Sequence, residues 1–253
     1  MAEPDALFDC LCRLGDNTLI LGHRLSEWCG HAPVLEEDIA LANTALDLIG
    51  LTQLWLGYAG EIEGKGRSAD DLAMLRDVWD FRNLLLVEQP NRDFGHTMMR
   101  QCLFDQFHVL QLNALSQSRD ATIAGIAAKA AKEAAYHASR SASVVIALGD
   151  GTEESHHRMQ SALDRLWPYA AEMFESDAID QAMAKAGIAP DPATLKQPFD
   201  AAINAILADA TLRRPAGDFA HTGGKSGFRH SEHLGHLLTQ MQWLQRAYPK
   251  AAW

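Results

Sequence analysis

Apolar residues recur at intervals of three and four along most of the chain, which is the period of one face of an α-helix. In residues 6–29 this face consists of Leu7, Leu11, Leu14, Thr18, Leu21, Leu25 and Trp28. A second such face lies in residues 91–118, and an alanine-rich one lies in residues 121–148. No segment shows the sustained alternation of apolar and polar residues that a half-buried strand requires. The pattern therefore predicts an all-α protein.

Proline positions and capping residues set the expected ends of the helices. Proline is absent between Pro33 and Pro90 and between Pro90 and Pro168, and these intervals can hold long helices because proline breaks helix interiors. Asp120 and Thr152 can cap the helices that follow them. We expect helices over residues 6–29, 34–63, 69–87, 91–118, 121–148, 152–174, 199–212 and 231–247. They predict a single helix-bundle domain, residues 1–253, with a core over about 6–175 and a C-terminal extension over about 176–253.

One stretch is long and apolar enough to test the expectation of a soluble protein. Residues 39–60 contain a single charge, Asp47, and a helix of this length could span a bilayer. Asp47 would lie in the middle of such a span, and acidic rather than basic residues precede it, namely Glu36, Glu37 and Asp38. A helix that is apolar nearly all round is also typical of the centre of a bundle, and we prefer this interpretation.

The composition agrees with a soluble, acidic protein. The 253 residues include 22 Lys and Arg and 33 Asp and Glu, which gives a net charge of −11, and 47% of them are hydrophobic. This charge disfavours binding to nucleic acid and to anionic membranes. Four cysteines without metal or redox spacing, and a first segment without the features of a signal peptide, indicate a cytoplasmic location.

Acidic residues and histidines are the candidates for chemistry. A carboxylate-bridged di-metal centre in a helix bundle takes one carboxylate from each of two helices and an E-x-x-H pair from each of the other two. E-x-x-H occurs here in EESHH, residues 153–157, where a capping turn at a helix N-terminus is the alternative. Three histidines recur every third residue and could also bind a metal or simply lie at the surface, namely His230, His233 and His236.

Asp105 and His137 lie at similar distances from the expected turn at Asp120, 15 residues before it and 17 after it. In an antiparallel hairpin they would meet, and we expect Asp105 to be buried and paired with His137, with His108 as a further partner. Two interpretations remain open at this point. The residues form a buried polar pair, or they belong to a metal site made of Asp105, His108, Glu133 and His137.

The first two helices offer no matching ligands at the same level. Thr18 lies 15 residues before Pro33 and Leu48 lies 15 after it, and Leu51 follows one turn later. One hydroxyl and two hydrocarbon side chains supply neither a carboxylate nor an imidazole. Half of a di-metal site is therefore missing from the sequence.

Several segments together resemble the structural C subunits of bacterial phenylacetyl-CoA 1,2-epoxidases, which are multicomponent ring monooxygenases. The resemblance covers nearly the whole chain, and the segments that carry it are LGDNTLIL, SEWCGHAP, IALANTALDLIG, NLLLVEQPN, KEAAYH and the tail TGGKSG…SEHLG…MQWLQRAYPKAAW. It implies a ferritin-like bundle and a non-catalytic subunit that supports a related di-iron subunit. The complex would epoxidise the aromatic ring of phenylacetyl-CoA with O2 in phenylacetate degradation.

The resemblance also implies which positions correspond to the iron ligands of the catalytic relative. These positions are Thr18, Leu48, Leu51, Asp105, Ala134 and His137. Of these, Asp105 and His137 alone could bind a metal. We therefore expect no cofactor in this chain, a di-iron centre in the catalytic partner, and NADPH, flavin and iron–sulfur in a reductase that binds transiently. The alternative is a metal-binding oxidoreductase that acts by itself through Asp105, His108, Glu133 and His137.

A bundle without a metal site still offers rigid helix faces to a partner. The first two helices carry more large apolar side chains than one core needs, namely Trp28, Trp55, Leu56 and Tyr58. We expect these residues at a large and lasting interface with the catalytic subunit.

Overall fold

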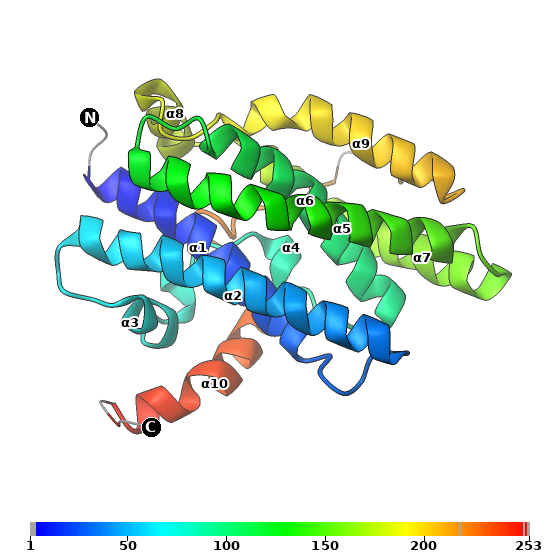
Figure 1. Ribbon diagram of the computed structural model, residues 1–253, viewed down its shortest axis with the longest axis horizontal. Helices are drawn as coiled ribbons and strands as arrows, with labels where there is room; N and C mark the ends of the chain where they lie inside the picture. Colours follow the sequence, from blue (N-terminus) through cyan, green and yellow to red (C-terminus); the bar gives the residue numbers. More distant parts are fainter. Residues whose placement is uncertain (1–3, 218, 250, 252–253) are drawn as a thin grey trace. The chain divides into compact units, whose positions relative to one another are not determined.

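The computed structural model describes residues 4–217, 219–249 and 251, and within these ranges every regular element is helical (Figure 1). The prediction of an all-α protein is confirmed. The described residues form two compact units: the first contains residues 4–31, 36–89, 222–249 and 251, and the second contains residues 32–35, 90–217 and 219–221. Residues 176–253 are thus shared between the two units. The end of the tail segment, with Lys250, Ala252 and Trp253, lies outside the described residues.

The first unit is built on two long helices that pack closely. In chain order its elements are α1 (Pro4–Ser26), α2 (Leu35–Glu63), α3 (Ala69–Met74), the 3-10 helix η1 (Val78–Asp80), α4 (Leu85–Glu88) and α10 (Glu232–Ala247). Gly15 permits the close contact of α1 with α2, because a Cβ at this position would lie 2.5 Å from Cδ2 of Leu56. Figure 1 shows these elements from dark blue to teal, and α10 in red.

The helix predicted over residues 69–87 is interrupted. α3 ends at Met74, and the chain then leads through η1 to the short helix α4. Two side chains of α1 hold the connecting segment: Asp16 accepts a hydrogen bond from the backbone N of Arg82 and Asn17 accepts one from the backbone N of Leu84, each at 2.8 Å. These buried acceptors satisfy backbone donors that a continuous helix would bond internally. The prediction was wrong because the partners lie 66 and 67 positions away in the sequence.

The second unit contains the remaining helices. In chain order they are α5 (Phe94–Leu115), α6 (Ala121–Gly149), α7 (Glu153–Leu166), η2 (Trp167–Tyr169), η3 (Ala171–Phe174), α8 (Ala178–Ala186), η4 (Pro192–Leu195) and α9 (Lys196–Asp209). The predicted caps are confirmed, since Asp120 accepts from the backbone N of Thr122 and of Ile123 at 3.0 Å, and Thr152 forms a capping box. α5 and α6 pack as an antiparallel pair (Figure 1). α7 ends earlier than expected because Pro168 follows, and α8 was not predicted.

α2 is, within the described part of the chain, a helix long and apolar enough to cross a membrane by length and composition. The core helix of a soluble protein passes the same test, and 44% of the most apolar stretch of α2 is buried inside the protein. Leu48, Trp55 and Leu56 are among its buried residues. α2 is therefore a core helix of the first unit, and one of its faces is exposed.

Candidate functional site

Thr18, Leu48 and Leu51 are all buried in the first unit, on α1 and α2. The hydroxyl oxygens of Thr18 and Thr52 lie 2.8 Å apart. Each hydroxyl is also within hydrogen-bonding distance of a carbonyl oxygen of its own helix, Gly15 O for Thr18 at 3.0 Å and Leu48 O for Thr52 at 2.9 Å. The polar groups at this position therefore satisfy one another.

These residues do not fit an iron centre. Di-iron sites in helix bundles need carboxylates and imidazoles from both helix pairs. Leu48 and Leu51 present only carbon, and the hydroxyl of Thr18 is already hydrogen-bonded. Over the described ranges, no group of three or more His, Cys, Asp and Glu side chains is placed to hold a metal ion.

Asp105 lies on α5 in the interior of the second unit and is 1% exposed. Its Oδ1 accepts a hydrogen bond from Nε2 of Gln101, which lies 2.7 Å away and one turn earlier on the same helix. Burial raises the pKa of the Asp105 carboxyl to about 7, and the polar side chains of Ser141 and Gln101 together with the charge of Arg140 offset part of this effect. The carboxyl is therefore partly protonated near neutral pH.

The expected pair of Asp105 with His137 is not formed between these described residues. The hydrogen bond of the carboxyl comes from Gln101 on its own helix, and Oδ2 of Asp105 has no hydrogen-bond partner among the described residues. The count of residues from Asp120 misplaced this level of the hairpin, because Gln106, next to Asp105, bonds to the carbonyl oxygen of Ala138 at 3.0 Å. Asp105 is therefore buried and hydrogen-bonded as predicted, but to Gln101 rather than to a histidine.

The remaining predicted residues of α5 and α6 do not converge on Asp105. His108 is buried and makes no hydrogen bond to Asp105 within the described contacts, and burial, with a smaller effect of His137, lowers its pKa to about 3. Ala134 and His137 are buried on α6, whereas Glu133 is exposed. The alternative metal site, which needs His108 and Glu133 beside Asp105 and His137, is not assembled in the structure.

The E-x-x-H run at the start of α7 forms a capping turn. Glu154 pairs with Arg158 at 2.6 Å, and Nδ1 of His156 lies 2.7 Å from the carbonyl oxygen of Gly149. The histidines near α10 also separate, since Nδ1 of His230 contacts a buried glutamate at 2.6 Å and His236 is exposed. Among the described residues, neither run forms a group of three or more potential metal ligands.

The residues expected at a partner interface lie partly inside the chain. Trp55 and Leu56 are fully buried and offer no surface to a partner, which corrects their assignment to an interface. Trp28 and Tyr58 are half-buried. The exposed apolar side chains of α2 are instead Leu35, Ile39, Leu46 and Leu54. Hydropathy alone identified the helix but not which of its faces is exposed.

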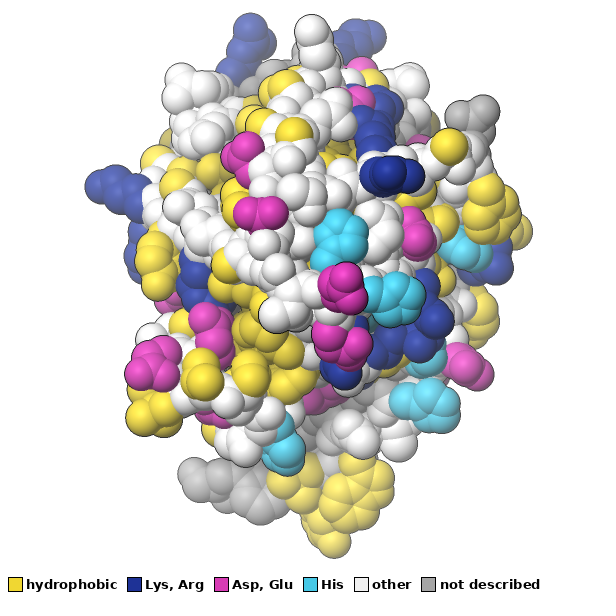
Figure 2. Space-filling view, turned by 90° about the vertical axis from the view of Figure 1, so that its right-hand side faces the viewer, with side chains coloured by type: hydrophobic (Ala, Val, Ile, Leu, Met, Phe, Trp, Pro, Cys, Tyr) yellow, Lys and Arg dark blue, Asp and Glu magenta, His cyan; other side chains and the backbone are white. Residues whose placement is uncertain are grey.

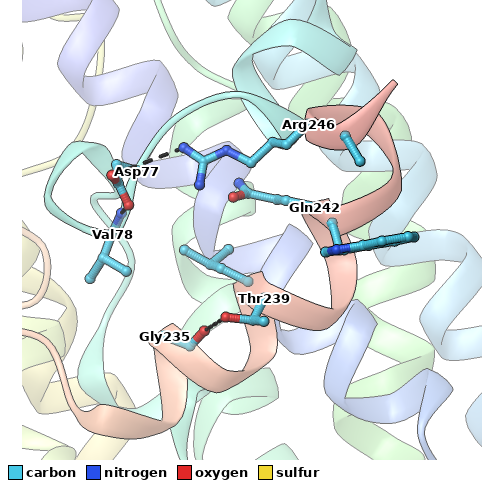
Figure 3. Close-up of a pocket in the computed structure, with 9 residues that line it drawn as sticks. Asp77, Val78, Gly235, Thr239, Gln242 and Arg246 are labelled. Atoms are coloured by element: carbon cyan, nitrogen blue, oxygen red, sulfur yellow. Dashed lines mark hydrogen bonds and ion pairs between the residues drawn. The ribbon is translucent and has the colours of Figure 1, made fainter. Parts of the chain in front are cut away.

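A groove of about 370 Å³ lies between α10 and the turn that opens η1 (Figure 3). Nε2 of Gln242 donates hydrogen bonds to the carbonyl oxygens of Ala73 and Arg76, at 2.9 and 3.0 Å. Arg246 lies 4.0 Å from Asp77 at the edge of the groove. The rest of its described lining is Val78, Gly235, Leu238, Thr239, Trp243 and Ala247. This lining combines no nucleophile with an activating base, so the groove does not resemble a catalytic site.

Sequence comparison supplies the relationship that the geometry alone does not. The family described as phenylacetic acid catabolic proteins matches residues 1–253. The chain belongs to this family. The C subunit of the 1,2-phenylacetyl-CoA epoxidase of Escherichia coli (strain K12) is 49% identical over 241 residues, which are 95% of this chain and 96% of that protein.

In this member of the family, two of the segments that carry the resemblance meet at Glu88. These segments are NLLLVEQPN, residues 83–91, and SEHLG, residues 231–235. The carboxylate of Glu88 is fully buried and accepts hydrogen bonds from Nδ2 of Asn83 at 2.9 Å and from the backbone N and hydroxyl of Ser231 at 2.7 and 2.6 Å. His230 Nδ1 lies 2.6 Å from the same carboxylate. The network fixes the start of α10 to α4.

A third segment, LGDNTLIL, supplies the buried acceptors Asp16 and Asn17 that hold the chain after α3. These family segments therefore act in the described structure as internal polar anchors. The sequence pattern does not point to Asp16 or Glu88, because their partners are remote in the chain. Each is an acidic residue inside an apolar helical stretch, and this pattern could have identified them, because a buried carboxylate needs a hydrogen-bond donor or a counter-charge.

Proposed function

We propose that this chain is a non-catalytic, structural subunit of a phenylacetyl-CoA epoxidase, in which a separate di-iron subunit epoxidises the aromatic ring. Family membership and the named relative support the assignment to such a complex. The non-catalytic role is carried by one observation. The positions on α1 and α2 that would hold iron ligands are Thr18, Leu48 and Leu51, and the hydroxyl of Thr18 is bonded within the protein.

The remaining donors are poor ligands. Asp105 has a pKa raised to about 7 by burial, so a metal would compete with a proton for this carboxylate near neutral pH. Ala134 offers no carboxylate beside His137. A metal held by one carboxylate and one imidazole would keep most of its coordination to water and bind weakly.

The iron content of the purified chain tests this proposal. We expect elemental analysis to find far less than one iron per chain, with the catalytic subunit purified in parallel as the positive control. Replacing Asp105 by Asn should leave the iron content unchanged. About two irons per chain, the content of a di-iron bundle, would contradict the proposal.

An exposed face of α2 supports a lasting contact with a partner helix. Its residues follow at intervals of four and three, and we call them the α2 seam: Ile39, Asn43, Leu46, Gly50, Gln53 and Gly57. This spacing suits two helices that cross at about 20°. A Cβ at Gly50 or Gly57 would meet nothing within 4 Å, although each glycine costs a helix about 1 kcal/mol relative to alanine. A partner helix that approaches closely would make use of the glycines.

The charges at the ends of the α2 seam favour a different chain over a second copy. Glu36 and Glu61 are exposed at the two ends, and α2 contains no Lys or Arg. Two copies packed along this seam, parallel or antiparallel, would place acidic ends together. We therefore infer a partner helix with an apolar centre and basic ends, which belongs to the catalytic subunit.

Co-purification from a tag on this chain alone tests the partner and the seam separately. The wild type should retain the catalytic subunit at moderate salt, whereas Leu46→Glu and Gly50→Leu should lose it. Gly235→Leu on α10 is the matched control, because a Cβ there also meets nothing within 4 Å. If the wild type does not retain the catalytic subunit, or if that subunit is fully active alone, the proposed structural role is contradicted. If the wild type and the seam variants all retain it, only the proposal that the α2 seam is the interface is contradicted.

We further infer that the electrons come from NADPH through a transiently bound reductase with flavin and iron–sulfur groups, and that the complex works in the cytoplasm. The net charge of −11 supports the absence of nucleic-acid and membrane partners. Product formation from phenylacetyl-CoA should require O2, NADPH, the reductase and the catalytic subunit, and should fall when this chain is left out. Full activity without the reductase would contradict the inferred electron path.

A further inference from the structure

A hollow of about 220 Å³ in the second unit lies between the start of α5 and one face of α7. Its lining consists of Arg92, Asp93, His96, His157, Arg158, Ser161, Ala162 and Arg165. Three guanidinium groups are thus set against a single carboxylate, in a chain whose net charge is −11. Figure 2, which looks onto the side where α7 begins in Figure 1, shows Lys or Arg and His side chains gathered with acidic ones near its middle.

The two helices bring these groups together for simple geometric reasons. Arg158, Ser161, Ala162 and Arg165 follow at i, i+3, i+4 and i+7, and so they share one face of α7. The small side chains of Ser161 and Ala162 leave space between the two arginines. α5 contributes its first turn, with His96, and this end of a helix carries partial positive charge.

The positive charges of the arginines that line the hollow are only partly balanced by acidic side chains. Within the described residues, Arg92 and Arg165 make no hydrogen bond or ion pair, while Nε of Arg158 contacts Glu154 at 2.6 Å. Arg92 also has a φ of 54°, a left-handed conformation that non-glycine residues seldom adopt. Strain of this kind is more frequent at functional sites than elsewhere.

His96 is the buried member of the lining. It is 4% exposed, and its ring makes no hydrogen bond to any described residue, although buried polar side chains are nearly always bonded. Burial, followed by the charges of Arg100 and Arg92, lowers the pKa of His96 to about 4. Asp93, the acid of the lining, accepts the backbone N–H of His96 at 2.7 Å and so serves to cap α5.

We propose that this hollow binds a phosphate group. Guanidinium groups pair with phosphate oxygens, the first turn of a helix attracts anions, and the hydroxyl of Ser161 and the neutral ring of His96 can each donate a hydrogen bond. The source is either free inorganic phosphate or a phosphate of a CoA thioester. The second source rests on the function proposed above, and the first does not.

Calorimetric titration of the full chain at constant ionic strength tests the site, with inorganic phosphate, CoA and 3′-dephospho-CoA as probes. We expect saturable binding of phosphate that weakens at least tenfold in Arg92→Gln and in Arg165→Gln. Lys132→Gln, at an exposed position of α6, is the matched control and should bind like the wild type. Tighter binding of CoA than of phosphate, partly lost in dephospho-CoA, assigns the 3′-phosphate. Equal affinities keep the phosphate site and exclude CoA as its source.

The ring of His96 provides a second, local readout. Bound phosphate should raise the pKa of His96 in an NMR titration of the ring protons, because the anion offsets the nearby arginine charges. Arg165→Gln should raise this pKa without any phosphate and should reduce the response to phosphate. The proposal is overturned if phosphate binding is not saturable or is unchanged in both arginine variants. It is also overturned if the variants lose only the catalytic subunit in co-purification, because the hollow then contacts a protein.

Discussion

Asp16 of α1 and Arg76, which follows α3, form a buried ion pair in the first unit. Nη1 of Arg76 lies 3.0 Å from Oδ2 of Asp16, and Nη2 contacts Oδ1 of the same carboxylate. Oδ2 also accepts the backbone N–H of Arg82 at 2.8 Å. Asp16 is 0% and Arg76 is 5% exposed. Each charge is stable at this depth only because the other is present, and the pair fixes the path of the chain after α3.

Replacing Arg76 by Met should strongly destabilise the protein. The substitution leaves the carboxylate of Asp16 buried without its counter-charge, and we expect the free energy of unfolding to fall by about 3–5 kcal/mol. Urea unfolding followed by circular dichroism measures the change. Arg246→Met in the same unit is the control, because Arg246 is exposed and lies 4.0 Å from Asp77, and it should change stability by less than about 0.5 kcal/mol. Equal effects of both variants would contradict the importance of the buried pair.

Replacing Glu88 by Gln should loosen α10. The amide removes the charge and turns one acceptor into a donor that faces the donors of Ser231, and the loss should amount to about 2–3 kcal/mol. Hydrogen exchange should show faster exchange in α10 than in the helices of the second unit. Glu232→Gln, at an exposed position at the start of α10, should leave the exchange pattern unchanged. Uniform acceleration in all helices would show that Glu88 acts on global stability rather than on α10.

The local pattern predicted most helices because their ends depend on nearby residues. Asp120 and Thr152 cap the helices that directly follow them, and their hydrogen bonds reach only two or three positions. The segment after α3 could not be predicted in the same way, since Asp16 and Asn17 of another helix determine its path. The path of such a segment depends on whether its backbone groups bond within a local helix or to remote side chains.

The candidate site shows the same limit. That Thr18, Leu48 and Leu51 supply no carboxylate and no imidazole follows from residue identity, which the sequence contains. The partner of Asp105 depends on how α5 and α6 are staggered, and counting from the turn named His137 where the structure has Gln101 of the same helix. The hollow at α5 and α7 has no sequence motif, because Arg92 precedes α5 whereas Arg158 and Arg165 lie more than 60 positions later, on α7.

Replacing each of two glycines by alanine should change the free energy of unfolding in opposite directions. At Gly15 a Cβ would lie 2.5 Å from Cδ2 of Leu56, so Gly15→Ala should lower the free energy of unfolding by about 1–3 kcal/mol. At Gly50 a Cβ meets nothing within 4 Å, so Gly50→Ala should raise it by up to about 1 kcal/mol through helix propensity. Denaturant titration of the isolated chain compares the two. Changes of the same sign would contradict the close packing of α1 on α2.

Asp105→Asn should stabilise the protein at alkaline pH, and the gain should vanish in acid. The folded-state pKa of Asp105 is raised from 3.8 to about 7 by burial, so folding disfavours its ionised form. Below about pH 4 the carboxyl is protonated in both states and contributes no pH-dependent difference. As pH rises from 4 to 7, the unfolded chain ionises while the folded chain stays protonated, and the wild type loses stability. Above about pH 7 both states are ionised, and the loss levels off.

The size and sign of this effect can be measured as a difference between two proteins. Asn cannot ionise, and all other titrating groups are common to both, so their contributions cancel in the comparison. The free energy of unfolding of Asp105→Asn minus that of the wild type should rise by up to about 4 kcal/mol between pH 4 and pH 8, because one pKa unit corresponds to 1.36 kcal/mol. Urea unfolding of both proteins at four pH values in this range gives the curve. A difference that does not rise with pH would show that folding does not raise the pKa of Asp105.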